Sequence, residues 1–389
     1  MKILHQLGHN CNWGLDTHFD NEIGDGFIFT AYSFDCAKMG QTISRRKSAD
    51  YLPLSMIDLQ FYGNKNSTGG KLATYPFHPI NNRRDKTSVG GIEKIQAAVT
   101  YQQRLGFKKI IIPFFYLEEQ NLNKTIKLIS RINKNVRLTH GYEYYMTIPF
   151  ANESIKNEEY VELLLQAITD INIEFDGYYI VCDSNPGYKK KVSVDFNYYT
   201  NLLKVFATLN KQGFKTIHGY ANWDAIVFNA LTNIDFVSIG TFENLRNFNI
   251  TRFTEKISGG PSDGWYYSEK LMNFIKAKDL TQFRNTGTLD MIRNDRNAFS
   301  DIILDESFAW STQKPDVHKN YLLAISRFYE RMRAQKDIKK RASYVLEKVY
   351  KARELYERLA TDHKVFLMDE SSDYHLDTWA AFIQRNILM

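Results

Sequence analysis

The stretch YYTNLLKVFATLNKQGFKTIHGY, residues 198–220, contains one complete helix-to-strand unit. Apolar residues recur at helical spacing up to Gln212, and Gly213 then occupies the position where glycine commonly ends a helix. The following run, 216–220, is typical of a strand. A second predicted helix, 91–105, ends in the same way at Gly106, directly before another apolar run. Repeated helix-to-strand units with short joints favour a parallel sheet.

The same alternation extends along most of the chain. Several of the predicted strands are apolar on both faces, as expected for a sheet covered by helices on both sides. We predict strands at 26–34, 54–62, 109–116, 136–146, 177–183, 216–220 and 235–242, with 301–305 as a further candidate. We predict helices at 91–105, 122–132, 157–168, 198–212 and 223–232. Because the number of units is near eight, we expect an α/β fold of the (β/α)8 TIM-barrel type, and an open doubly wound parallel sheet is the alternative.

The pattern also suggests how the chain is divided. We expect a barrel over residues 1–312, with insertions at about 64–90 and 246–298, the second of them helical, and a helical extension over 313–389. Residues 320–359 predict two long helices with a break near 335–339. These helices either pack across the barrel or form an interface for a partner protein or a second copy of the chain.

Composition narrows the functional classes. The chain carries a net charge of +6 with 24 Tyr and 26 Phe, which is compatible with a polyanionic partner. Its three cysteines are far apart and form no CxxC pair, which suits a reducing compartment. No run of about eighteen apolar residues occurs, and the first residues do not resemble a signal peptide. We therefore expect a cytoplasmic protein with no membrane segment, and the sequence indicates no cofactor.

Polar residues near the ends of predicted strands are the candidates for catalysis, because strand carboxyl ends meet at one face of a barrel. The alternative for each acidic residue is capping of the next helix. Asp183 follows a buried strand within VCDSNPG, and His218 lies beside a glycine that admits close approach of a ligand. The wider set comprises Asp35, Asp58, Gln60, Glu118, Glu119, His140, Glu143, Asp183, His218 and Glu243. Of these we favour Asp183 and Glu243 as acid, base or nucleophile, His218 as base or oxyanion partner, and Glu143.

Other residues are candidates for substrate binding. Tyr142 and Trp265 offer stacking surfaces, and Trp265 follows a glycine-rich stretch at 259–264 that could hold a phosphate. Arg83 and Arg84 would supply positive charge in the first insertion. A group of His and Cys side chains near the start could bind a transition metal, although its spacing matches no established motif and a polar loop explains it as well. That group is His5, His9, Cys11, Asp16, His18 and Asp20.

The run HGYANWDAIVFNALTNIDFVSIGTFENLRN, residues 218–247, resembles part of the tRNA-guanine transglycosylase barrels. Asn233-Ile234-Asp235 resembles a turn of that family, and Asp176-Gly177-Tyr178 resembles an earlier Asp-Gly-Tyr. The chain departs from the family where its nucleophilic aspartate would fall, since Ser238 stands there, and where its base-reading glycines would be Val181 and Cys182. No counterpart of the family's zinc-binding cysteines exists. The resemblance implies a divergent barrel relative and carries over no catalytic residue.

Three functions remain open at this point. The first is an enzyme, or degenerate enzyme, acting on a nucleic acid, nucleobase or nucleotide as a transferase or hydrolase, with transglycosylation as one such reaction. The second is a glycoside-processing hydrolase that uses Glu143 and Glu243 as paired carboxylates. The third is a non-enzymatic scaffold subunit. The sequence leaves the substrate, the oligomeric state and any metal dependence open.

Overall fold

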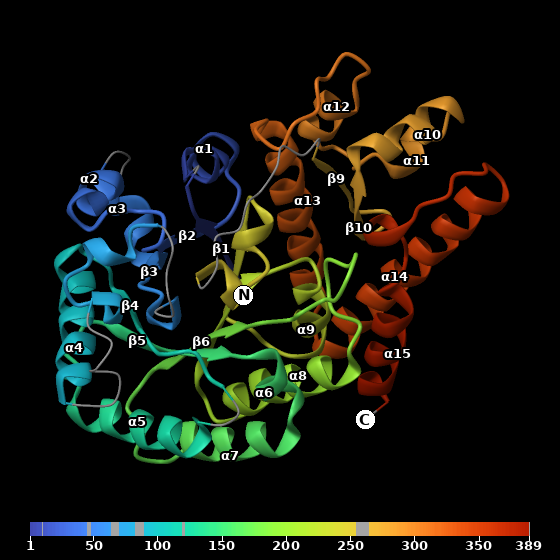
Figure 1. Cartoon of the computed structure of the whole chain (residues 1–389). Helices are drawn as coiled ribbons and strands as arrows, with labels where there is room; N and C mark the ends of the chain where they lie inside the picture. Colours follow the sequence, from blue (N-terminus) through green and yellow to red (C-terminus); the bar gives the residue numbers. More distant parts are fainter. Residues whose placement is uncertain are drawn as a thin grey trace.

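The computed structural model describes residues 1–9, 11–44, 48–63, 70–81, 89–118, 121–253 and 264–388. In this part of the chain eight parallel strands form a nearly closed barrel, in the order β3-β2-β1-β8-β7-β6-β5-β4 (Figure 1). The prediction of a TIM-type barrel is therefore confirmed, and the open sheet is not formed. The strands are β1 Lys2–Leu7, β2 Gly26–Thr30, β3 Met56–Asp58, β4 Lys109–Ile112, β5 Glu143–Phe150, β6 Gly177–Cys182, β7 Lys215–Ala221 and β8 Phe236–Gly240.

The barrel has one seam without a strand ladder, between β3 and β4. There the side-chain amide of Gln102, from helix α4, takes the place of a neighbouring strand. It accepts a hydrogen bond from the Ile111 N–H (3.0 Å) and donates one to the Ile111 carbonyl (2.7 Å). Because buried backbone groups must be paired, this residue satisfies the edge of β4 where β3 is too short to do so.

Helices cover the outside of the barrel (Figure 1). Their apolar faces pack on the strands, as the sequence pattern predicts, and Gly106 and Gly213 take the positive φ that allows the chain to turn back into a strand. They are α1 Cys11–Asn21, α2 Met39–Ser44, α3 Ser48–Tyr51, α4 Val89–Arg104, α5 Leu122–Asn135, α6 Asn152–Lys156, α7 Glu158–Ile168, α8 Phe196–Lys211 and α9 Ala225–Leu231.

The eighth strand is β1, and the candidate strand at 301–305 is wrong. Residues 301–304 belong to helix α12, Ala298–Leu304. The strand at the start of the chain was missed because the polar residues His5 and Gln6 interrupt its apolar run. Both are almost fully buried, His5 between β1 and the helical layer and Gln6 beside Ser238 of β8.

Strand β5 begins and ends later than predicted, at 143–150 instead of 136–146. Pro149 accounts for the error at the end of the strand, because proline is normally absent from the interior of a sheet. The absence of an N–H group at Pro149 removes no hydrogen bond of the sheet, because the regular part of β4 has already ended at Ile112. The Pro149 carbonyl accepts a hydrogen bond from the Leu117 N–H (2.9 Å). The shift moves Ala151, Asn152 and Glu153 to the carboxyl end of this strand.

The second predicted insertion contains a hairpin as well as helices. It carries the antiparallel strands β9 Trp265–Ser268 and β10 Asn273–Lys276 and the short helices α10 Leu280–Asn285 and α11 Leu289–Ile292. The C-terminal region forms α13 Pro315–Arg333, α14 Ile338–Thr361 and α15 Leu376–Ile387, so two long helices with a break after Arg333 are confirmed. Helix α13 packs against β9, and α14 packs against α9 and α15 (Figure 1).

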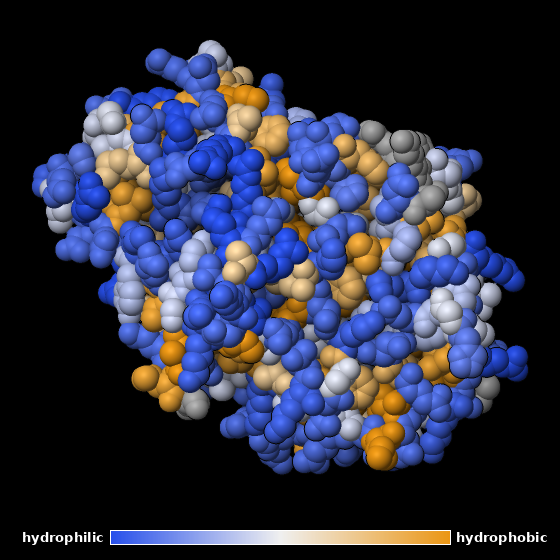
Figure 2. Space-filling view, turned by 180° about the vertical axis from the view of Figure 1, so that it is seen from behind, coloured by the Kyte–Doolittle hydropathy of each residue, from blue (hydrophilic) through white to orange (hydrophobic). Residues whose placement is uncertain are grey.

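The face shown in Figure 2 is largely hydrophilic, with apolar residues in small separate areas. Among the described residues, no helix is both long enough and apolar enough to cross a membrane.

Candidate functional site at the carboxyl end of the barrel

A pocket of about 550 Å³ opens at the carboxyl ends of β4, β5 and β6. This is the end of a barrel at which catalytic groups are found. Four separate chain segments build it, one after each of these strands and one in the connection after β8. The lining residues are Tyr116, Glu118, Ala151, Asn152, Glu153, Asp183, Asn185, Asn249, Ile250 and Thr251.

Asp183, one of the four candidates favoured from the sequence, lies on the wall of this pocket. It follows β6 directly, and its side chain accepts a hydrogen bond from the Asn185 N–H (3.1 Å). Burial raises the pKa of Asp183 to about 6, although hydrogen bonds from the N–H groups of Asn185 and Ile250 and from the Tyr116 hydroxyl oppose the rise. The negative charge of Glu153 adds to the increase. A carboxyl group with this pKa can hold a proton close to neutral pH and can also release it.

A second buried carboxyl lies deeper in the barrel. Asp58, at the end of β3, accepts hydrogen bonds from Tyr62 (2.6 Å) and Tyr179 (3.1 Å), and Tyr220 lies at the limit of that distance (3.5 Å). Burial raises its pKa to about 6. The ring of Phe248 packs against Tyr62 and Tyr220 on one side and near Tyr116 on the other. Asp58 does not line the pocket, so Asp183 is the buried carboxyl that a ligand in the pocket would meet.

Glu143 does not lie at this end of the barrel. It is the first residue of β5 and therefore sits at the amino end, where its carboxylate bonds to Lys109 (2.7 Å) and Lys215 (3.0 Å) and accepts from Tyr145 (2.5 Å). Burial alone would raise the pKa of Glu143, but these three partners lower it to about 2. The expected pairing of Glu143 with Glu243 is wrong, because the length of the barrel separates them. The later start of β5 explains the error.

Tyr142 is at the same amino end and does not form part of the pocket. It precedes β5, and the ammonium of Lys108 lies 5.0 Å from its ring centre. Tyr142 and Glu143 thus lie at the amino end of the barrel, where the Glu143 carboxylate neutralises the largely buried Lys109.

His218 faces outward from β7 instead of toward the site. Its ring packs against Phe206 of α8 and Phe228 of α9, at centroid distances of 5.1 and 5.8 Å. Burial lowers the pKa of His218 to about 3, and its Nδ1 has no hydrogen-bond partner within the described structure. Side chains alternate across a strand, and it is Gly219 that faces inward, against the Tyr179 ring. The role of His218 as base or oxyanion partner is not available in this position.

Glu243 and Trp265 belong to a separate cluster at the carboxyl end. Glu243 follows β8 and bonds to the buried Lys191 (2.7 Å), whose ammonium also lies 3.9 Å from the centre of the Trp265 ring. Burial alone would raise the pKa of Glu243, yet Lys191 and the nearby Arg246 lower it. The Trp265 ring is also approached by Lys276, at 5.6 Å. Its face is therefore occupied by cations of this chain, and Glu243 is held ionised.

Of the remaining candidates, Glu118 also lines the pocket, whereas Asp35, Gln60 and His140 are not among its lining residues. Arg83, Arg84, Glu119 and the glycine-rich residues 259–263 are outside the described residues. In the N-terminal group, His5 bonds to the Ile23 carbonyl (2.6 Å) and His18 to the Gly24 carbonyl (3.1 Å). No cluster of three or more His, Cys, Asp or Glu side chains suited to a metal ion occurs within the ranges that the structure describes.

Sequence reasoning missed much of the pocket wall. Glu153 and Asn152 were hidden by the misplaced end of β5, and Tyr116 was assigned to the end of a predicted strand, 109–116, although β4 ends at Ile112. The Asn152 amide donates to the Asp183 carbonyl (3.0 Å) and so ties the end of β5 to that of β6. A signal for these residues was present, because Ala-Asn-Glu directly follows the apolar run that ends in Pro149 and Phe150.

Comparisons with known proteins identify no relative of this chain. No protein-family model matches the chain, and no curated protein matches it in sequence.

Proposed function

We propose that this protein is a barrel enzyme that cleaves or exchanges a glycosidic bond of a nucleoside or a nucleic acid, with Asp183 as the general acid. The observation that carries the proposal is a buried carboxyl group, with its pKa raised to about 6, on the wall of a pocket at the carboxyl end of the barrel. Catalytic acids are commonly tuned toward neutral pH by burial in this way.

The chemistry requires two carboxyl groups with different protonation states. The protonated Asp183 donates its proton to the leaving base or oxygen as the bond to the sugar carbon breaks. Glu153 lines the same pocket and is exposed. As a carboxylate it either attacks the sugar carbon or takes a proton from the water whose oxygen bonds to that carbon.

The composition of the pocket wall supports a neutral reacting group. Among the described residues, the lining contains Glu118, Glu153 and Asp183 and no lysine or arginine. Amide side chains of Asn152, Asn185 and Asn249 can bond to sugar hydroxyls or to the edge of a base. A phosphate group would be repelled by these carboxylates and must be held outside the pocket. The choice of a base-bearing substrate is supported by the net charge of +6 and by the resemblance of residues 218–247 to transglycosylase barrels.

A glycoside hydrolase acting on oligosaccharides is the second candidate. The same acidic and amide lining favours it, because such sites bind sugars through hydroxyl groups. The pair of carboxyls in this case is Asp183 and Glu153 and not the pair expected from the sequence. The two candidates differ in the product, since one releases or exchanges a base and the other releases a reducing sugar.

The test compares Asp183→Asn with Asp176→Asn. The two aspartates flank the same strand, β6, and each accepts a hydrogen bond from a backbone N–H, but only Asp183 lines the pocket. The proteins are incubated with nucleosides, single-stranded RNA and DNA, transfer RNA and aryl glycosides, and released base and reducing sugar are measured. We expect Asp183→Asn to lower the rate by a factor of about 10²–10⁴ and Asp176→Asn to leave it unchanged. Full activity of Asp183→Asn, or no turnover of any of these substrates, contradicts the proposal.

A further inference from the structure

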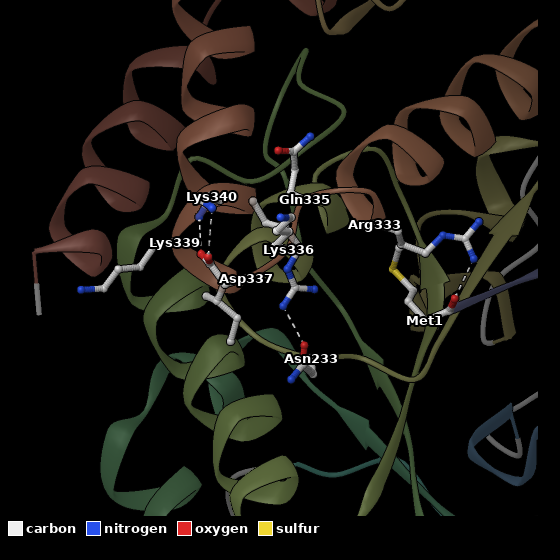
Figure 3. Close-up of a pocket in the computed structure, with 10 residues that line it drawn as sticks. Met1, Asn233, Arg333, Gln335, Lys336, Asp337, Lys339 and Lys340 are labelled. Atoms are coloured by element: carbon white, nitrogen blue, oxygen red, sulfur yellow. Dashed lines mark hydrogen bonds and ion pairs between the residues drawn. The ribbon is translucent and has the colours of Figure 1, made fainter.

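A second pocket, of about 990 Å³, lies at the opposite end of the barrel from Asp183. Its wall is formed by Met1 at the start of β1, Asn233 in the turn before β8, and the link between α13 and α14 (Figure 3). The full lining is Met1, Asn233, Arg333, Gln335, Lys336, Asp337, Ile338, Lys339, Lys340 and Arg341.

Positive charge dominates this basic pocket. Five of its ten lining residues are lysine or arginine, and Asp337 is the only acidic one. Figure 3 shows the cations approaching from two sides, with Arg333 beside Met1 and with Lys339 and Lys340 on the α14 side. Five like charges around one opening repel one another, and a bound anion relieves that repulsion.

The described contacts leave much of this charge without a carboxylate. Arg333 donates to the Met1 carbonyl (2.9 Å), and Arg341 donates to the Asn233 side-chain oxygen (2.7 Å), so both guanidinium groups are oriented by neutral acceptors. The Lys340 ammonium lies 3.9 Å from the Asp337 carboxylate. Lys336 and Lys339 form no ion pair with any residue in the described ranges. Burial lowers the pKa of Arg341, in line with a guanidinium held partly away from water.

The start of helix α14 adds to the attraction for anions. This helix has 24 residues, and its first turn, Ile338–Arg341, lines the pocket. Asp337 caps it by accepting from the Lys340 N–H (2.8 Å). The amino end of a helix carries partial positive charge, and the Asp337 carboxylate offsets part of it, so the lysine and arginine side chains supply most of the attraction.

We propose that the basic pocket binds phosphate groups of a nucleic-acid backbone. Planar guanidinium groups and flexible ammonium groups are the side chains that bind phosphate most often. The five cations are spread along one opening, which suits several phosphates spaced along a strand better than one small anion. This inference rests on the proposed function, because it supplies the phosphate contacts that the acidic pocket at the other end of the barrel cannot make.

The experiment measures binding of a fluorescein-labelled single-stranded RNA, a single-stranded DNA and a transfer RNA across a salt series. The variants are Lys336→Gln/Lys339→Gln in the basic pocket and Lys124→Gln/Lys127→Gln as the matched control. Both pairs are exposed lysines three residues apart, and the control pair lies on α5 outside the basic pocket. Asp183→Asn is included as a variant of the acidic pocket. Thermal unfolding checks that all four proteins are folded.

We expect the wild type to bind with an affinity that falls as salt rises, because binding releases counterions. Loss of two single-strand phosphate contacts makes the slope of log K against log salt shallower by about 1.4 in Lys336→Gln/Lys339→Gln. The control pair and Asp183→Asn retain the wild-type slope. This set of results supports the proposal.

Two results would overturn it, and they differ in what they imply for the enzyme. If the wild type binds nucleic acid and Lys336→Gln/Lys339→Gln binds with the same slope, the basic pocket is not the phosphate site, and the proposed activity at Asp183 stands. If the wild type binds none of the three probes at low salt, no nucleic-acid backbone is recognised, whereas turnover of free nucleosides or glycosides still tests Asp183 independently.

Discussion

The side-chain amide of Gln102 makes two hydrogen bonds to the backbone of Ile111, one to its N–H and one to its carbonyl. A helix residue thereby completes the barrel at the seam between β3 and β4, where the strands themselves form no ladder. Strand β4, whose carboxyl end forms part of the pocket, borders this seam. The stability of the barrel is therefore expected to depend on one buried glutamine.

Gln102→Leu tests this dependence. Leucine has a similar size but leaves a buried N–H and a buried carbonyl without partners, at a cost of about 1–3 kcal/mol for each group. We expect the free energy of unfolding to fall by about 2–6 kcal/mol, measured by urea denaturation. Gln103→Leu is the control, because Gln103 bonds to the side chains of Thr139 and Tyr144 and not to a strand edge. Equal losses in the two variants would show that the seam has no special role.

Tyr116→Phe is expected to shift the pH profile of the reaction. The Tyr116 hydroxyl lowers the pKa of Asp183 by bonding to its ionised form, so its removal raises that pKa above about 6. A general acid works only while protonated. The rate of the wild type should therefore fall above about pH 6, and the fall should occur at higher pH in Tyr116→Phe. The measurement is kcat/KM against pH, and an unchanged profile would argue against Asp183 as the acid.

Glu153→Gln tests the role of the Glu153 carboxylate separately from that of Asp183. Its negative charge raises the pKa of Asp183, so its removal should move the basic limb of the profile to lower pH. If Glu153 is the nucleophile or base, the rate at the optimum also falls by about 10²–10⁴. Glu159→Gln, at an exposed site on α7, is the control. A shifted limb with an unchanged maximum would leave Glu153 with only an electrostatic effect.

Glu143→Gln is expected to affect stability and not catalysis. The variant leaves the largely buried Lys109 with a neutral partner, and because Glu143 is about one-third exposed we expect a loss of only about 1–2 kcal/mol. The pKa of Glu143 is lowered to about 2, so its contribution is present above about pH 4.5 and is lost as pH falls toward 2. Urea denaturation at several pH values checks both points. A loss of turnover with unchanged stability would contradict a purely structural role for Glu143 at the amino end of the barrel.

Because of its buried histidines, we expect the protein to lose stability in acid. Burial lowers the pKa of five of them to about 3 or 4, whereas in the unfolded chain they accept protons near pH 6.5. The unfolded state therefore binds more protons below that pH, and stability is lost as pH falls from about 6.5 toward 4. The five are His5, His78, His218, His318 and His375.

Three buried aspartates act in the opposite direction. Burial raises the pKa of Asp58 and Asp183 to about 6 and that of Asp224 to about 7, so these groups bind protons in the folded state first. Protonation of these three aspartates therefore stabilises the folded state as pH falls from about 7 to 4. Five histidines outnumber three aspartates, and we therefore expect a net loss of stability between pH 6.5 and 5.

His218→Phe isolates one of the histidines. The neighbours are the rings of Phe206 and Phe228, and the Nδ1 atom has no partner in the described structure, so phenylalanine is compatible with the site. The dependence of unfolding free energy on pH should become shallower by up to about 1.4 kcal/mol per pH unit, which is the value for one proton. His140→Phe, at an exposed position, should leave it unchanged. Equal slopes for the wild type and His218→Phe would contradict a neutral buried imidazole.

The barrel itself could be predicted from the sequence because its signals are local. Helical periodicity ending at Gly213 or Gly106, followed by an apolar run, specifies one unit without reference to the rest of the chain. Asp183 was found for the same reason, since a buried strand followed by a carboxylate and a turn is a local pattern. The break between α13 and α14 was likewise visible in the sequence.

The tertiary structure determined which residues lie close together in space. The pocket joins residues after β4, β5, β6 and β8, and no local pattern shows that Tyr116, Glu153, Asp183 and Asn249 converge. A shift of a few residues in β5 placed Glu143 at the amino end instead of the carboxyl end, because a strand in a parallel barrel presents opposite ends to opposite faces. The inward or outward direction of His218 depended on the alternation of side chains and on which helices cover β7. The sequence thus determined the helix-to-strand units and the position of Asp183 at the end of a strand. The packing of those units determined which residues surround Asp183 and which form the basic pocket at the amino end of the barrel.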